Sequence, residues 1–232
     1  MRNVFNSTNG SAIIDNGLRK YMISVFNKMF LALGLTGAVA YLCVSSPAVF
    51  AFMTSGFSIV LMIATIGIVL YLSSRINKIS SRRAINLFWI ISTLLGAFLS
   101  PIFAIYTHES IASAFFSTGV FFGGMSLYGY TTKKDLTRVG SFMMIGLFSV
   151  IITSLVNIFF MHSSTLELGL SALCVIIFCA LTAYHIQKIK SFYDTKIDEE
   201  TISKRATLGA LSLYLDFINL FLALLRLFGN RR

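Results

Sequence analysis

Seven apolar runs, each long enough to cross a lipid bilayer as a helix, constrain the fold more than any other feature of the sequence. The hydrocarbon core of a bilayer is about 30 Å thick, so a crossing helix needs about 20 consecutive apolar residues. The runs lie at residues 22–46, 48–73, 84–106, 110–130, 138–161, 165–186 and 206–228. We therefore expect an all-α polytopic membrane protein with seven transmembrane helices.

The amino-acid composition argues against a water-soluble fold. Hydrophobic residues make up 56% of the 232 residues and charged residues only 12%, whereas soluble domains carry about 25% charged residues. The three cysteines all lie inside apolar runs, without a CxxC spacing, and are interpreted as small buried side chains. We expect an N-terminal tail at 1–21, one membrane domain at 22–229 and a C-terminal tail at 230–232.

The formal charge of +10 is distributed in a way that favours lipid headgroups over nucleic acid as partners. Lys and Arg follow the second, fourth and sixth runs, and the loops after the first, third and fifth contain neither. Because basic loops are retained on the cytoplasmic side during insertion, this pattern places the N-terminus and the even loops in the cytoplasm. The bilayer is the expected partner, and no nucleic acid is expected.

The end of the chain leaves two alternatives. Seven crossings put the C-terminus outside, yet Arg226, Arg231 and Arg232 give it the charge of an inside segment. Either the last run re-enters the membrane, or its charges are tolerated outside once six earlier helices have fixed the orientation, which we prefer.

Two features inside the runs predict local packing. Gly119 and Gly123 form a GxxxG pattern that lets another helix approach closely. We assign that approach to a helix of the same chain rather than to dimerisation, and expect a monomer. Pro101, beside Ser100, is expected to kink its helix, with neighbouring groups bonding the carbonyl that it frees.

Asp216 is the most informative polar residue, since a carboxylate at the centre of a membrane helix costs about 2.5–3.5 kcal/mol on insertion scales. Residues three and four apart place it on a small and polar stripe that should face the bundle interior. The stripe comprises Gly209, Ser212, Asp216, Asn219, Ala223 and Arg226. A second stripe, Gly146, Ser149, Thr153 and Asn157, offers either oxygens to a polar interior or interhelical hydrogen bonds.

Three stretches of sequence resemble the Bax inhibitor family, the transmembrane Bax-inhibitor-motif proteins. GALSLYLDFINLFLALLRLFG (209–229) is similar to the family's signature last helix. FFGGMSLYGYTTKKDLTRVGS (121–141) and AYHIQKIK (183–190) resemble its fourth segment with the following loop and the end of its sixth segment. The resemblance covers essentially the whole chain after about residue 15.

The resemblance implies six helices around a central seventh, and a calcium leak gated by protonation of a buried acidic pair. Asp216 matches one member of that pair, whereas the usual Asp of the other member is replaced here by His185, after Tyr184. Protonated His attracts a carboxylate, so we expect pH gating that is shifted, weakened or changed in shape. Arg75 is a candidate partner for Asp216 or for the pore mouth, although an interfacial anchor is preferred.

Three functional classes compete. A channel-like leak fits best: Asp216, with Ser212, Asn219 and Asn157, offers hard oxygen ligands for a weak, transient calcium site, and calcium is then the permeant ion rather than a cofactor. The alternative is a non-transport protein that modulates a membrane protease through the charged loop 187–205. An enzyme is not expected, because no paired nucleophile and base is evident. The short chain suggests a bacterial inner membrane.

Overall fold

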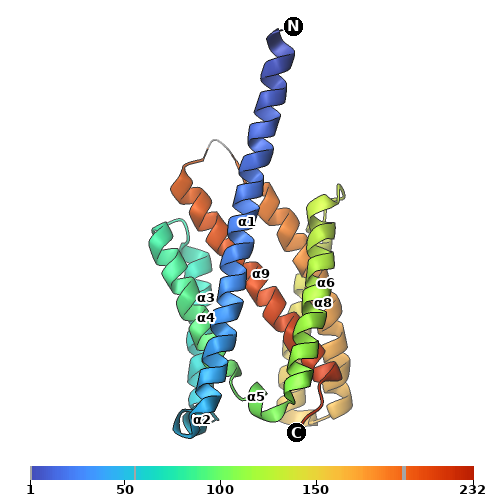
Figure 1. The fold of residues 1–232 in the computed structure, drawn as a ribbon. Helices are drawn as coiled ribbons and strands as arrows, with labels where there is room; N and C mark the ends of the chain where they lie inside the picture. The colour runs from blue at the N-terminus through green and yellow to red at the C-terminus, as the bar shows by residue number, and fades with distance from the viewer. Residues whose placement is uncertain (1, 55, 195–196) are drawn as a thin grey trace.

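A computed structural model describes residues 2–54, 56–194 and 197–232. Helices follow one another along this described part, joined by short connections (Figure 1). In chain order the elements are α1 (Arg2–Ser45), α2 (Pro47–Thr54), α3 (Phe57–Arg75), α4 (Ser81–Leu99), α5 (Ile102–Ile105), α6 (His108–Thr131), α7 (Thr137–Val156), the π-helical turn η1 (Asn157–Met161), α8 (Ser164–Ser191) and α9 (Glu199–Phe228). Because α1 is already helical at Arg2, the expected tail at 1–21 is helical where it is described.

Seven stretches of the described chain are long and apolar enough to cross a bilayer, which confirms the predicted number of transmembrane helices. Their ends differ from the predicted ones by several residues. The spans are Asn16–Ser45, Phe57–Arg75, Ser81–Ile105, His108–Thr131, Thr137–Met161, Ser164–Ser191 and Glu199–Phe228.

The second apolar run, expected as one segment over 48–73, is divided into two helices. Pro47 begins α2, as suits a residue whose ring fixes φ and which lacks an N–H. With 8 residues, α2 is too short to span a membrane. Gly56 then precedes α3, where glycine's low helix propensity favours an interruption. The second crossing therefore starts at Phe57, and rings of Phe52 and Phe57 pack 4.3 Å apart across the break.

Pro101 ends α4 and separates it from the single turn of α5. Proline lacks the N–H that would donate to the carbonyl of Ala97, four residues earlier. The Ser100 hydroxyl donates to that carbonyl instead, at 2.8 Å. The predicted disruption of this helix is present, and the freed acceptor is satisfied by the residue beside the proline.

The last helix, α9, is the most buried of the seven spans. In the most apolar stretch of α9, 67% of the residues are buried, against 39% or less in each other span of the described chain. Its main neighbours are α1, α4, α6 and α8, whereas α3 packs chiefly on α4 and α7 on α8. Figure 1 shows α9 running obliquely between α1 and α6. A complete ring of six helices around α9, as the resemblance implies, stays a prediction.

The two ends of the bundle differ in charge. The N-terminus and the basic loops lie at one end and the C-terminus at the other (Figure 1). At the basic end Glu200, in the first turn of α9, accepts a hydrogen bond from the backbone N–H of Ser81 at 3.4 Å. At the opposite end Arg231 forms an isolated antiparallel bridge with Tyr106. Therefore α9 runs the full length of the bundle, as expected for a complete crossing rather than for a re-entrant segment.

The GxxxG pattern of α6 is not used as predicted. A Cβ built on Gly119 or Gly123 meets no atom within 4 Å among the described residues, so no helix of this chain packs closely there. The close approach on α6 is instead at Gly129, where a Cβ would lie 2.3 Å from the carbonyl oxygen of Ala183 on α8. The expectation of intramolecular packing at Gly119 and Gly123 was therefore wrong. The close contact of α6 with α8 forms at Gly129, nearer the basic end.

Candidate functional site: a buried His–Asp pair

His185 of α8 and Asp216 of α9 form a short ion-pair contact inside the bundle. The Nδ1 atom of His185 lies 2.6 Å from Oδ2 of Asp216. The Asp216 side chain is 4% exposed and that of His185 is 19% exposed. One proton between these two atoms makes the hydrogen bond: either Nδ1–H donates to the carboxylate, or a protonated carboxyl donates to Nδ1. The structure thus brings together the two residues that the sequence selected from segments far apart in the chain.

The packing of α8 on α9 explains how these two side chains meet. The two helices are antiparallel neighbours with the most extensive contact in the described fold. Gly209, two turns before Asp216, allows the approach, because a Cβ there would lie 3.0 Å from the Ile189 side chain of α8. The contact between His185 and Asp216 joins the same two helices nearer to the middle of α9.

The remaining polar residues of the α9 stripe turn back to their own helix. The Ser212 hydroxyl donates to the carbonyl of Leu208 at 3.2 Å, and the Asn219 amide donates to that of Leu215 at 2.7 Å. Both side chains are half-buried. They lie on the predicted stripe, but their hydrogen bonds stabilise their own positions and leave the Asp216 carboxylate to His185.

Asn157 lies away from the pair and has a structural role. Its amide donates to the carbonyl of Ser163 at 3.1 Å, and its side-chain oxygen accepts from the N–H of Ser163 at 2.9 Å. These two hydrogen bonds close the turn around His162, which adopts a left-handed conformation with φ of 49°. On the predicted polar face of α7, Ser149 is exposed, Gly146 and Thr153 are half-buried, and Asn157 is buried.

Arg75 is exposed at the C-terminal end of α3. Because α3 packs on α4 rather than on α9, this guanidinium is not brought to Asp216. Its position agrees with the alternative role, an anchor at the membrane interface at the basic end.

A second polar contact of α9 was not predicted. The hydroxyl of Tyr214 lies 2.7 Å from Oγ1 of Thr36 in α1, which in turn donates to the carbonyl of Ser92 in α4 at 3.0 Å. Tyr214 is fully buried. A tyrosine in the middle of an apolar run is the signal that could have found it, because a buried phenol needs a hydrogen-bond partner.

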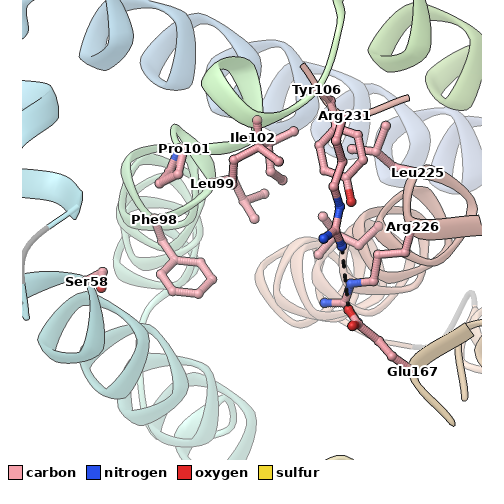
Figure 2. Close-up of a pocket in the computed structure, with 12 residues that line it drawn as sticks. Ser58, Phe98, Leu99, Pro101, Ile102, Tyr106, Glu167, Leu225, Arg226 and Arg231 are labelled. Carbon is pink, nitrogen blue, oxygen red and sulfur yellow. Dashed lines mark ion pairs between the residues drawn. The ribbon is translucent and has the colours of Figure 1, made fainter. Parts of the chain in front are cut away.

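At the C-terminal end a cavity of about 500 Å³ opens between α3, α4 and α5 on one side and α8 and α9 on the other. Most of its lining is apolar, with Phe98 and Leu225 among the side chains (Figure 2). In the cavity lining Arg231 forms an ion pair with Glu167, with 4.0 Å between the guanidinium and the carboxylate. Arg226 lines the same cavity. Two arginines against one glutamate give the lining of this cavity an excess of positive charge.

Asp216 alone supplies fewer donors than a resident metal ion needs. Among the described residues no group of three His, Cys, Asp or Glu side chains is placed to hold a metal ion. Asp216 is a single carboxylate, and Ca²⁺ takes six to eight oxygen ligands in a stable site. Any calcium contact at Asp216 would therefore be transient.

The fold and the pair define an integral, multi-pass α-helical membrane protein with an ionisable contact between its two last helices. The family described as inhibitor of apoptosis-promoting Bax1 matches residues 18–232. A protein of Rickettsia prowazekii is 44% identical over 227 residues, which are 97% of this chain and 96% of that protein. The inner membrane protein YbhL of Escherichia coli K12 is 45% identical over 221 residues, 93% of this chain and 94% of YbhL.

These matches cover nearly the whole chain and extend to a membrane protein of Streptococcus pyogenes, 33% identical over 228 residues. The chain belongs to the Bax inhibitor family. The resemblance found in its last helix is thereby confirmed.

Proposed function

We propose that this protein is a channel-like, pH-sensitive calcium leak whose permeation is gated by the contact between His185 and Asp216. The observation that carries the proposal is the 2.6 Å contact between Nδ1 and Oδ2, buried between α8 and α9. An ionisable residue inside a membrane domain is a candidate for an ion pathway by default, because burying it is costly. In this proposal the paired arrangement corresponds to the closed state, because the imidazole engages the carboxylate.

Calcium is the proposed permeant ion because of the ligand chemistry at Asp216. Carboxylate oxygens are hard ligands that suit Ca²⁺ better than transition metals. A lone carboxylate binds weakly, and an ion that permeates must leave as readily as it enters. Toward the C-terminal end the fully buried Leu220 and Leu224 follow Asp216 on α9, so opening must displace apolar side chains as well as the pair.

The charge of the imidazole sets the proposed direction of gating. A histidine changes its charge between about pH 5 and 8. In its cationic form His185 attracts the Asp216 carboxylate and holds the interface closed. A neutral imidazole keeps only a hydrogen bond to the carboxylate, without the attraction of opposite charges, so the leak should increase with pH. In the described chain neither residue has another ion-pair partner that would mask this change.

The test is Ca²⁺ flux into liposomes that contain the purified protein, measured from pH 5 to 8. The wild type should conduct more at pH 8 than at pH 5, and Asp216→Asn should remove most of that pH dependence. His185→Asp should conduct still more at pH 8, because two ionised carboxylates in contact repel each other. Asp135→Asn removes an exposed carboxylate of the α6–α7 loop and should behave as wild type.

The proposal fails if wild-type liposomes show no flux above empty ones, or if Asp216→Asn leaves the flux curve unchanged. Failure of flux would favour the alternative, a non-transport protein that modulates a membrane-bound protease. The exposed acidic residues Asp198, Glu199 and Glu200 offer a contact of opposite sign to the basic loops around them. Their neutral replacement should then abolish co-purification of such a partner, whereas Asp216→Asn should preserve it.

The proposed location is a bacterial inner membrane, with the N-terminus in the cytoplasm. The relative YbhL is described as an inner membrane protein, and the basic loops lie at the end that carries the N-terminus. Positive charge is retained on the cytoplasmic side, so this end should face inward.

A further inference from the structure

A groove of about 490 Å³ runs between α1 and α6 in the half of the bundle near the basic end. Its walls come from α1 and α6, which have no extensive contact with each other, and its floor comes from Ile186 of α8 and Phe217 of α9. Figure 1 shows α9 between these two helices. The walls comprise Arg19, Met22, Ile23, Phe26 and Phe30 of α1 and Gly119, Phe122, Gly123, Ser126, Leu127 and Tyr130 of α6.

The two glycines of the GxxxG pattern line this groove, and no described helix packs on them. A Cβ on Gly119 or Gly123 would meet no atom within 4 Å in the described chain, so the two glycines form a smooth open wall. Small residues on a membrane helix allow close approach of another apolar surface. The groove is therefore shaped for an apolar occupant other than a helix of the described chain.

Ser126 supplies a polar atom that also lacks its partner. Its residue is 8% exposed, and its hydroxyl has no hydrogen-bond partner in the described structure. Among the described residues the Tyr21 hydroxyl is the other buried one without a partner, whereas that of Thr118, on the same helix as Ser126, donates to the carbonyl of Ala114 at 2.7 Å. A buried hydroxyl without a partner is unfavourable, so the occupant should bring an acceptor to Ser126.

The position of Arg19 identifies the occupant's charge. Arg19 lines the groove at the basic end and is exposed there, one turn inside the first span, so we expect it near the lipid headgroups. From Gly119 to Tyr130 the wall extends over eleven residues of helix, about 16 Å at 1.5 Å per residue, which matches the ~15 Å depth of one leaflet's hydrocarbon. The groove thus has a cationic mouth, a hydroxyl donor below it and an apolar floor reaching the bilayer centre.

We propose that this groove binds one anionic phospholipid. The phosphate pairs with the Arg19 guanidinium, the Ser126 hydroxyl donates to a glycerol ester carbonyl, and an acyl chain lies across Gly119 and Gly123. An ester carbonyl suits Ser126 better than a partner helix does, because the backbone carbonyls of a membrane helix are already hydrogen-bonded within that helix.

The test is binding of phosphatidylglycerol to the full-length protein in detergent, followed by native mass spectrometry. Gly123→Leu should fill the groove and remove one tightly retained lipid. It should fold, because a Cβ at Gly123 meets no atom within 4 Å. Gly67→Leu is the matched control, since Gly67 is also exposed on a membrane helix and unopposed, but lies on α3 outside the groove.

A second pair of variants tests the headgroup without changing the groove. Arg19→Gln should weaken phosphatidylglycerol binding about fivefold, the effect expected for one basic residue near a lipid headgroup. Lys20→Gln removes the same charge from an exposed neighbour that does not line the groove, and should leave the affinity unchanged.

Two results would overturn the inference. Retention of the lipid in Gly123→Leu at wild-type affinity would show that lipid binds elsewhere. A dimeric wild type that becomes monomeric in Gly123→Leu, with no lipid retained by either, would show that a second copy occupies the groove. Neither result depends on whether the protein conducts calcium.

Discussion

Many hydroxyl side chains inside the membrane spans donate to the carbonyl four residues earlier on their own helix. Thr118 bonds to Ala114 in this way, and Thr182 bonds to Phe178. Such residues carry little information about neighbouring helices. Asp216 and Tyr214 differ, because each reaches another helix from the buried centre of α9. Two residues apart, they fasten α9 to α8 on one side and to α1 on the other.

Tyr214→Phe tests the second of these contacts. The change removes the hydroxyl that lies 2.7 Å from Thr36, while Thr36 keeps its bonds to the carbonyls of Ala32 and Ser92. Because no other buried group loses its last partner, the free energy of unfolding should fall by only about 0.5–2 kcal/mol.

Reversible unfolding in mixed micelles would measure this loss. Tyr71→Phe, which removes a hydroxyl from an exposed side chain of α3, is the control and should change little. A Tyr214→Phe protein as stable as wild type would mean that the Thr36 contact contributes nothing to holding α9.

Among the helices, glycine serves two different purposes that the sequence does not distinguish. At Gly129 of α6 a Cβ would meet the backbone of Ala183, so the absence of a side chain lets α6 and α8 touch. At Gly124, on the same helix, a Cβ meets nothing within 4 Å. A glycine that faces a neighbouring backbone fixes helix packing, whereas one that faces open space does not.

Gly129→Ala should therefore destabilise the α6–α8 contact. The added methyl would lie 2.3 Å from a carbonyl oxygen, and a backbone atom cannot move aside without shifting the helix. Overpacking of this kind costs about 1–3 kcal/mol. The measurement is the thermal midpoint of the purified protein in detergent, with Gly124→Ala as the matched variant.

Gly124→Ala should be neutral or slightly stabilising, because alanine favours helix by up to about 1 kcal/mol over glycine. Equal midpoints for the two alanine variants would show that α6 does not pack on α8 through Gly129.

The molecule as a whole is polarised from one end to the other. Basic loops and the N-terminus lie at one end, and the C-terminal residues lie at the other, tied to the α5–α6 connection. There the N–H of Arg232 donates to the carbonyl of Ile105 at 2.8 Å, and that of Thr107 to the carbonyl of Asn230 at 3.2 Å. These backbone hydrogen bonds hold the C-terminal arginines at the end of the bundle whose loops contain no Lys or Arg.

Cysteine labelling of intact cells tests the orientation that follows. In a background with the three native cysteines replaced, Asn230→Cys should react with a membrane-impermeant maleimide. Lys133→Cys, in the basic α6–α7 loop, should react only after the membrane is permeabilised, because basic loops face the cytoplasm. Labelling of both positions from the same side would contradict a full crossing by α9.

The two members of the candidate site were accessible to sequence reasoning for different reasons. Asp216 was found because a carboxylate within an apolar run is costly and therefore rare. His185 was found through the family resemblance, since an isolated histidine near a helix end has many ordinary explanations. For Asn157 the helical spacing suggested either a lining role or hydrogen bonding, and in the structure its amide closes the turn before α8.

The sequence by itself determined that seven helices cross the membrane, that the last one is exceptional, and which family the chain belongs to. These properties depend on run length, charge and local motif, which are readable along the chain. Only the tertiary structure decided which helices touch: Gly129 rather than Gly119 meets a neighbour, Tyr214 reaches Thr36, and α9 meets α8 at His185. Between helices in lipid no hydrophobic force selects partners, so close packing and a few hydrogen bonds make that choice.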